Sequence, residues 1–446
     1  MKFFKKSIAF LLVIVVFCTP LQVYASEMNT GVVSYLTPTS AETTALRWSL
    51  KMGTSYKNAP STQIVVDDTL VFMSGKMLYK VDIENGEIIR SAEMVDYPSF
   101  SYTAPTYADG VVYCPLENGT VQAFNYRTLS SMWIYKDQLS GQALTEIVYS
   151  DGYIYTGFWN NEDAYANYVC IDVRDEDVFS KTEEKSAEWT YKSLGGFYWA
   201  KAVIYGDSII FGCDDGTNYD NKPSKLVSLN KYNGSLIDTY AIQGDQRSGV
   251  TVYESYLYAA TKAGYLYRVK LNSDGTFSDG DSKKLSLGGA STSAPVIYKN
   301  RLYLGVQGES FGKGYMKVID AKNLKVIYSA QTKGYPQNSV LVSNAYEDKV
   351  YIYTTYNAGP GGISVFTDKP GQTSAVSSDL FLPEGDMRGY CISSIAVSED
   401  GTLFYKNDSG YIFALENTEN QPEEENWFIK FINSIIDFFK NLFGIG

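Results

Sequence analysis

Short runs of alternating apolar and polar residues, separated by glycine turns, recur along most of the chain. In residues 102–133 three β-rich runs cover 105–108, 111–115 and 120–125, and a fourth run reaches Trp133. The turns between the first three are Asp109-Gly110 and Asn118-Gly119, the strongest short-range signals for hairpins because both need positive φ. The unit predicts a four-stranded antiparallel meander of about 40 residues, the size of a propeller blade.

Further copies of this unit occupy residues 58–91 and 293–329, and looser copies begin near Ala143, Ala202, Gly249, Ser339 and Ser393. Eight copies predict an all-β fold, an eight-bladed propeller of four-stranded antiparallel blades. Blades stack into one ring, so the 446 residues do not imply several separate domains.

The two ends of the repeat region are incomplete in complementary ways. The last copy, 393–417, contains three strands, whereas residues 44–53 form one strand with an outer-strand signature at Arg47-Trp48. We predict that this N-terminal strand completes the last blade, which removes two exposed sheet edges. The propeller then spans 44–417, after a polar leader at 26–43.

The first 25 residues have the pattern of a secretory signal peptide, with a basic start, an apolar core and a small-residue cleavage site before Ser26. The alternative, a membrane anchor, would need a longer apolar core. Cleavage would remove three lysines and change the formal charge from −12 to −15. From the signal peptide we expect a secreted, extracellular protein associated with the cell envelope. The net negative charge disfavours nucleic acid as a partner.

Histidine is absent and cysteine is scattered. Without histidine the chain has no Ser-His or Cys-His nucleophile and no imidazole acid or base. Beyond the signal peptide the cysteines are Cys114, Cys170, Cys213 and Cys391, in different blades and with no C-x-x-C spacing. We interpret them as small buried apolar residues rather than disulfides or metal ligands.

The C-terminus carries a second kind of pattern. Residues 418–425 are an acidic linker, and 426–446 repeat apolar residues every three or four positions, as in an amphipathic helix about 30 Å long. Six polar residues argue against a helix that spans a bilayer, and the linker keeps the helix off the propeller, so we favour a helix that lies on a membrane surface or on a partner. The residues expected to dock are Trp427, Phe428, Phe431, Ile435, Phe438, Phe439, Leu442 and Phe443.

Two copies share a more specific motif. One contains Ala104, Pro105, Asp109, Tyr113, Gly119, Ala123, Asn125 and Trp133; the other contains Ala294, Pro295, Asn300, Tyr303 and Asp320. This motif resembles the PQQ-like repeat of quinoprotein dehydrogenases and of the propeller lipoprotein that acts in outer-membrane assembly, over about residues 44–417. The resemblance implies eight blades and raises PQQ and calcium as cofactors. However, the family's enzymes cap the quinone with adjacent cysteines, and this chain has no such pair, so we expect no resident cofactor.

Inserts interrupt three blades, at 159–189, 214–225 and 357–362. The second insert, DDGTNYDNKPSK, is dense in oxygen ligands but lacks the regular positions of a calcium loop, so a solvated turn is the simpler interpretation.

Residues that precede the inner strands are expected to ring one mouth of the central channel. They are Tyr56, Tyr102, Gln142, Tyr198, Trp199, Arg247, Thr292, Gln337, Arg388 and Tyr390. Two of them end a shared tetrapeptide, Gly-Asp-x-Arg, at 244–247 and 385–388. Such an arginine beside aromatic rings would suit a carboxylate or sugar ligand, whereas local Asp–Arg pairing would only fasten a loop.

These patterns favour an exported, non-enzymatic propeller that binds a protein or glycan at the cell envelope and is tethered by its C-terminal helix. We assign no catalytic residue and no metal site. A PQQ- and calcium-dependent oxidoreductase is the alternative, and a carbohydrate-active propeller using Asp245 or Asp386 is a further one.

Overall fold

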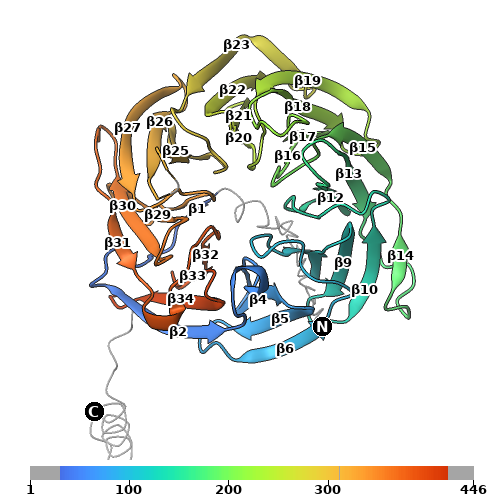
Figure 1. The fold of residues 1–446 in the computed structure, drawn as a ribbon, viewed down its shortest axis with the longest axis horizontal. Coiled ribbons are helices and arrows are strands. Elements are labelled where there is room, and N and C mark those ends of the chain that lie inside the picture. Colours follow the sequence, from blue (N-terminus) through green and yellow to red (C-terminus); the bar gives the residue numbers. More distant parts are fainter. Residues whose placement is uncertain (1–30, 311, 420–446) are drawn as a thin grey trace, which may run out of the picture.

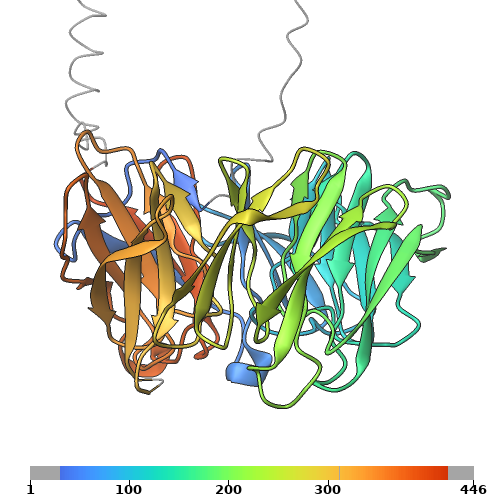
Figure 2. The same ribbon diagram turned by 90° about the horizontal axis from the view of Figure 1, so that it is seen from above.

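The computed structural model describes residues 31–310 and 312–419, which form eight β-sheets arranged around a ring (Figure 1). Seen from the side, the sheets stand next to one another like the blades of a propeller (Figure 2). The all-β, eight-bladed prediction is therefore confirmed. The signal peptide, the acidic linker from residue 420 onward and the amphipathic helix fall outside the described residues. Within 31–419 no helix is long and apolar enough to cross a membrane.

Each blade is an antiparallel meander that begins with its inner strand. The first two blades are β3 (Ile64–Val66), β4 (Thr69–Ser74), β5 (Met77–Asp82) and β6 (Ile88–Glu93), then β7 (Thr106–Ala108), β8 (Val111–Pro115), β9 (Thr120–Asn125) and β10 (Ser131–Lys136). The third and fourth are β11 (Val148–Ser150), β12 (Tyr153–Gly157), β13 (Tyr165–Asp172) and β15 (Trp189–Leu194), then β16 (Val203–Tyr205), β17 (Ser208–Gly212), β18 (Pro223–Asn230) and β19 (Leu236–Gln243).

The other half of the ring follows the same plan. The fifth and sixth blades are β20 (Thr251–Tyr253), β21 (Tyr256–Ala260), β22 (Tyr265–Leu271) and β23 (Phe277–Ser286), then β24 (Val296–Tyr298), β25 (Arg301–Gln307), β26 (Gly314–Asp320) and β27 (Lys325–Thr332). The seventh contains β28 (Leu341–Ser343), β29 (Val350–Thr355), β30 (Ile363–Asp368) and β31 (Ser378–Phe381), and the eighth contains β32 (Ala396–Val397), β33 (Leu403–Lys406) and β34 (Tyr411–Asn417). Two 3₁₀ turns, η2 (Tyr56–Asn58) and η3 (Gly385–Met387), lie in connections between blades.

The eighth blade is completed by β2 (Thr44–Lys51), which pairs antiparallel with β34 from Thr44 opposite Asn417 to Lys51 opposite Tyr411. Figure 1 shows this junction as the blue β2 beside the red β34. Arg47 strengthens it with ion pairs to Asp400 and Glu416 at 2.8 and 2.7 Å. The predicted closure of the ring is confirmed.

Two additional strands were not predicted. β1 (Val32–Val33), from the polar leader, pairs parallel with the inner strand β28 of the seventh blade. β14 (Glu183–Lys185), from the insert of the third blade, pairs parallel with the outer strand β10 of the second. Both strands are only two or three residues long and carry no alternation that a sequence pattern could detect.

The hairpin turns have the conformation that their sequences predict. Asp109 and Gly110 have φ of 48° and 79°, and Asn118 and Gly119 have φ of 55° and 70°. Left-handed backbone costs little at glycine and is tolerated by Asn and Asp, so these pairs set the register of the strands.

Apolar side chains fill the space between neighbouring blades, and outer-strand tryptophans lock three of these junctions. Each donates its indole N–H to a backbone carbonyl of the next blade, at 2.8–3.0 Å, in the pairs Trp48–Ile83, Trp133–Val173 and Trp189–Lys231. In the sixth blade Tyr328 takes this position, and its hydroxyl donates to Asp368 at 2.8 Å. The four cysteines are buried and free, as predicted.

Candidate functional site

The mouth of the propeller is the face of the ring at which the inner strands begin. Five aromatic side chains line part of it in a continuous series, which we call the aromatic cluster. Its members are Tyr56, Phe100, Trp199, Tyr198 and Trp159, with successive ring centroids 5.9, 6.0, 4.9 and 5.2 Å apart. These spacings are those of favourable tilted and edge-to-face pairs. Tyr56, at one end, is 46% exposed.

Three members of the aromatic cluster, Tyr56, Tyr198 and Trp199, were expected at the mouth from the sequence. Phe100 and Trp159 were missed. Phe100 lies two residues before the predicted Tyr102, and the centroids of their two rings are 5.5 Å apart. Trp159 follows the second strand of its blade rather than preceding the first, so a search of residues before inner strands could not find it.

Arg247 lies beside the aromatic cluster, with its guanidinium 4.6 Å from the ring centroid of Tyr198. It occupies the centre of a set of carboxylates that we call the acidic cluster: Glu162, Asp214, Asp220 and Asp245. Nη2 of Arg247 is 2.7 Å from Asp214, 3.0 Å from Asp245 and 3.9 Å from Asp220, and it also donates to Glu162.

Burial dominates the electrostatics of this cluster. The side chains of Asp214 and Asp245 are fully buried, and that of Arg247 is 8% exposed. Burial raises the pKa of Asp245 to about 7 and raises the pKa of Asp214 well above its usual value, although Arg247 opposes both shifts. Burial acts to lower the pKa of Arg247, but the carboxylates of Asp214 and Asp245 outweigh it and the net shift is upward.

A second buried cation, Lys406, lies on another side of the mouth, in the eighth blade. Its Nζ is 3.3 Å from the ring centroid of Tyr102, whose hydroxyl donates to Asp408. The lysine is fully buried, and Nζ has no hydrogen-bond partner among residues 31–419. Burial lowers the pKa of Lys406 to about 7, against the opposing charge of Asp408.

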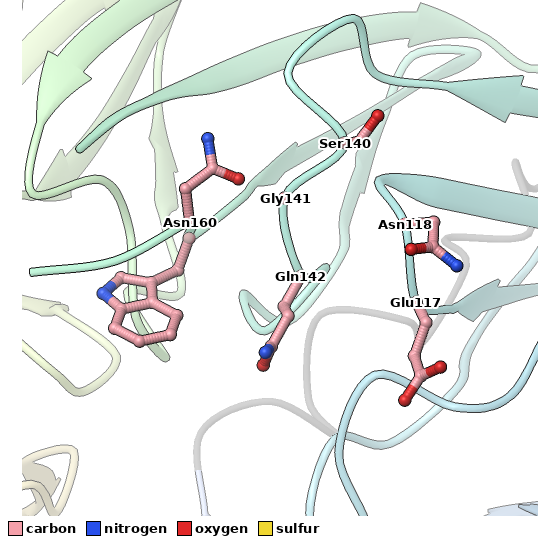
Figure 3. A pocket seen from close by; sticks show the side chains of 7 residues that line it. Glu117, Asn118, Ser140, Gly141, Gln142 and Asn160 are labelled. Atoms are coloured by element: carbon pink, nitrogen blue, oxygen red, sulfur yellow. The ribbon is translucent and has the colours of Figure 1, made fainter.

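A small pocket opens at the mouth between the second and third blades (Figure 3). Its volume is about 230 Å³, and its walls come from the β8–β9 turn, the connection between the two blades and the loop after β12. The residues labelled in Figure 3 are Glu117, Asn118, Ser140, Gly141, Gln142 and Asn160. Trp159 completes the lining and joins the pocket to the aromatic cluster.

Comparisons with known proteins agree with this fold. A family model described as outer membrane protein assembly factor BamB matches residues 25–175. The fold is similar to that of BamB from Moraxella catarrhalis, with a TM-score of 0.56, 13% identity, and coverage of 84% of this chain and 97% of that one. It is also similar to quinohemoprotein alcohol dehydrogenase from Comamonas testosteroni, with a TM-score of 0.66, 11% identity, and coverage of 89% and 79%.

The match over residues 25–175 and these solved structures support a fold like that of the PQQ-like β-propellers. A computationally designed protein, Ika8, has a similar fold as well, with a TM-score of 0.54, 10% identity, and coverage of 82% of this chain and 99% of that one. A comparison with curated protein sequences found no match. The fold is thus shared with an assembly factor, an enzyme and a designed protein, so the fold alone does not define a function.

The dehydrogenases similar to this propeller raise the question of whether its mouth fits calcium and PQQ. Carboxylate oxygens of Glu162, Asp214 and Asp245 lie within 4.8 Å of one another, close enough to bind one cation. However, the guanidinium of Arg247 contacts all three. A divalent cation there would lie against a fixed positive charge, so these residues do not fit a metal while Arg247 is in place.

The insert considered for calcium is closed by its own hydrogen bonds. The carboxylate of Asp215 accepts from the backbone N–H and hydroxyl of Thr217, both at 2.8 Å, and from the backbone N–H of Lys222 at 2.7 Å. These bonds account for the turn, and Asp214 leaves the loop to pair with Arg247.

The remaining predicted residues are spread around the mouth rather than joined in one site. Gln337 accepts a hydrogen bond from Asn357 at 2.5 Å, and its backbone carbonyl accepts one from Thr292 at 3.0 Å. Arg388 and Tyr390 are exposed, the latter by 57%. The geometry therefore gathers one half of the predicted ring and leaves the other half as separate positions.

Proposed function

We propose that this propeller is an exported, non-enzymatic protein that binds a protein or a glycan at the cell envelope. Its mouth makes the contact, and the helix predicted at 426–446 attaches it to a membrane surface or a partner. The observation that carries the proposal is the aromatic cluster, which begins at the half-exposed Tyr56 and continues to the pocket at Trp159. Aromatic side chains are enriched in binding surfaces because they bury a large area with little loss of conformational entropy.

The acidic cluster supports a binding role over a catalytic one. Arg247 pairs with the carboxylates of Asp214 and Asp245, and both are fully buried, so these two groups are not presented to a substrate for acid–base chemistry. The similarity to BamB agrees with a place at the cell envelope and with a protein partner.

Photo-crosslinking in the producing cells tests this proposal. A photoreactive amino acid replaces Tyr56, and the control replaces Tyr232, which is similarly exposed (46% and 50%) but lies in the β18–β19 turn on the opposite face. We expect adducts at position 56, of protein or of protease-resistant glycan, in clear excess over position 232. Equal labelling at the two positions would contradict a binding role for the mouth.

The second candidate is a PQQ- and calcium-dependent oxidoreductase. The similarity to quinohemoprotein alcohol dehydrogenase and the close approach of Glu162, Asp214 and Asp245 favour it. The position of Arg247 and the lack of adjacent cysteines weigh against it.

A further inference from the structure

We propose that the pocket between the second and third blades binds one sugar unit of a neutral glycan. This inference rests on the proposed binding function and names the ligand class of one part of the mouth. At about 230 Å³ the pocket is below the range of roughly 300–1,000 Å³ that suits drug-sized ligands, and a single pyranose ring is a compact ligand of the right scale.

The polar groups of the pocket suit a ligand rich in hydroxyls. The side chains of Glu117, Ser140 and Gln142 have no hydrogen-bond partner among residues 31–419, so they are available to a ligand. Figure 3 shows Glu117 and Gln142 extending from neighbouring loops around the same opening. A carboxylate, a hydroxyl and an amide together both donate and accept, as sugar hydroxyls do.

The two asparagines of the pocket are held in fixed orientations. Nδ2 of Asn118 donates to Asp96 at 2.7 Å, and Nδ2 of Asn160 donates to the carbonyl of Tyr165 at 2.6 Å. One N–H of each amide is engaged in this way, which orients the amide and leaves its Oδ1 atom as an acceptor. Fixed acceptors lose little entropy when a hydroxyl binds, which favours recognition.

Trp159 supplies the apolar part of the site. Its ring makes an edge-to-face contact with Tyr198, and its indole nitrogen is buried without an acceptor in the described part of the chain. A pyranose has an apolar C–H face as well as polar edges, so an aromatic ring beside hydrogen-bonding groups complements it. A peptide side chain would instead need a mainly apolar pocket as its anchor.

The local charge selects against acidic sugars. Glu117 lies near Asp96. The pKa of Glu117 is raised mainly by burial and, to a smaller extent, by the negative charge of Asp96. No cation is among the described residues that line the pocket, and the nearby Lys76 already pairs with Asp96 at 3.8 Å. An anionic ligand would therefore meet the carboxylate of Glu117 without a positive charge in the lining to offset it.

Gly141 keeps the pocket open. A Cβ at this position would lie 2.5 Å from Oδ1 of Asn160 and 3.1 Å from Cβ of Phe158. The substitution Gly141→Ala should therefore displace Asn160 and weaken the site without adding or removing a polar group.

Saturation-transfer NMR and calorimetry with the purified full-length chain test the proposal. The probes are methyl glycosides of glucose, galactose, mannose and N-acetylglucosamine, with glucuronate as the anionic comparison. We expect at least one neutral probe to bind and glucuronate to bind at least about tenfold more weakly. Trp159→Ala should weaken binding about tenfold, and Gln142→Ala about threefold, because they remove an aromatic contact and one hydrogen bond.

Gln331→Ala is the matched control, because Gln331 is an exposed glutamine of the outer strand β27 and lies outside the pocket. It should bind like the wild type. The proposal would be overturned if no neutral probe bound at millimolar concentration. It would also be overturned if a folded Trp159→Ala or Gly141→Ala protein bound the probe as well as the wild type does. If that happens while position 56 still crosslinks to a protein, only the glycan inference fails; if position 56 also fails, the proposed function fails with it.

Discussion

The mouth contains two buried basic side chains, one on each of two sides, and their electrostatic environments are opposite. Arg247 is surrounded by four carboxylates, whereas Lys406 is buried against the ring of Tyr102 and its Nζ finds no hydrogen-bond partner within the described chain. The pKa of Arg247 is raised and that of Lys406 is lowered to about 7. Carboxylate partners thus decide whether a buried cation is held charged or becomes easy to neutralise.

The source of the partners explains the difference. Glu162 and Asp214 come from the inserts of the third and fourth blades, where the β12–β13 and β17–β18 loops lie beside Arg247. On the side of the eighth blade, Asp408 lies near Lys406 but accepts its hydrogen bond from Tyr102. The inserts therefore supply carboxylate partners to a buried cation on one side of the mouth only.

The largest expected effect is that of Arg247→Met. It would leave the buried Asp214 and Asp245 without their cation, which costs about 3–5 kcal/mol of the free energy of unfolding. Urea unfolding at pH 7.5 measures this loss, and Arg388→Met is the control with an unchanged midpoint. A loss below about 1 kcal/mol would show that the acidic cluster does not depend on Arg247.

Lys406→Met should instead increase the free energy of unfolding. The pKa of Lys406 is 10.5 in the unfolded chain and about 7 in the folded protein. Between pH 7 and 10.5 the unfolded chain therefore binds more protons than the folded protein, and the wild type becomes more stable as pH rises. We expect the variant to be more stable by about 2 kcal/mol at pH 7 and below, since loss of the Tyr102 contact offsets part of the gain. The advantage should shrink toward pH 10.5.

Urea unfolding of both proteins from pH 6 to 10 would follow this difference. A variant that is less stable than the wild type at pH 6, or an advantage that stays constant with pH, would mean that Lys406 is not buried as a costly charge.

Tyr102→Phe tests the link between Lys406 and Asp408. It removes the hydrogen bond to Asp408 and keeps the aromatic ring over Lys406, so we expect a loss of about 1 kcal/mol. Tyr390→Phe, at an exposed position, is the control for the loss of a tyrosine hydroxyl. Equal midpoints for the two variants in thermal unfolding would count against the Tyr102–Asp408 interaction.

The smallest effect is expected in the second Gly-Asp-x-Arg tetrapeptide. Asp386 is exposed, where it pairs with Lys51 at 3.3 Å and accepts from Tyr411 at 2.8 Å. Asp386→Asn should leave the midpoint of urea unfolding unchanged, whereas Asp245→Asn in the first tetrapeptide should shift it. Similar shifts in both would mean that the two tetrapeptides have the same role.

The sequence predicted the ring and its closure because both depend on local patterns. Asp-Gly and Asn-Gly turns define the hairpins, and the lone strand around Arg47-Trp48 matches the strand missing from the eighth blade. The strands β1 and β14 were not predictable because they add to blades distant in sequence and are too short to show a period.

The candidate site was only half predictable for a similar reason. Residues before the inner strands could be read from the repeat, which identified Tyr56, Tyr102, Tyr198, Trp199 and Arg247. Trp159, Glu162 and Asp214 come from inserts, whose path over the mouth depends on tertiary packing. The two Gly-Asp-x-Arg tetrapeptides also had no local feature to show that only Arg247 would be buried among carboxylates.

The most direct test of a binding propeller without a quinone cofactor is a titration of the purified chain with PQQ and calcium, followed by tryptophan fluorescence. Trp159 and Trp199 lie in the aromatic cluster next to Arg247, so a ligand bound there should change their emission. Our account predicts no saturable response up to high micromolar concentrations. Saturable quenching that requires calcium would contradict it and would favour the oxidoreductase.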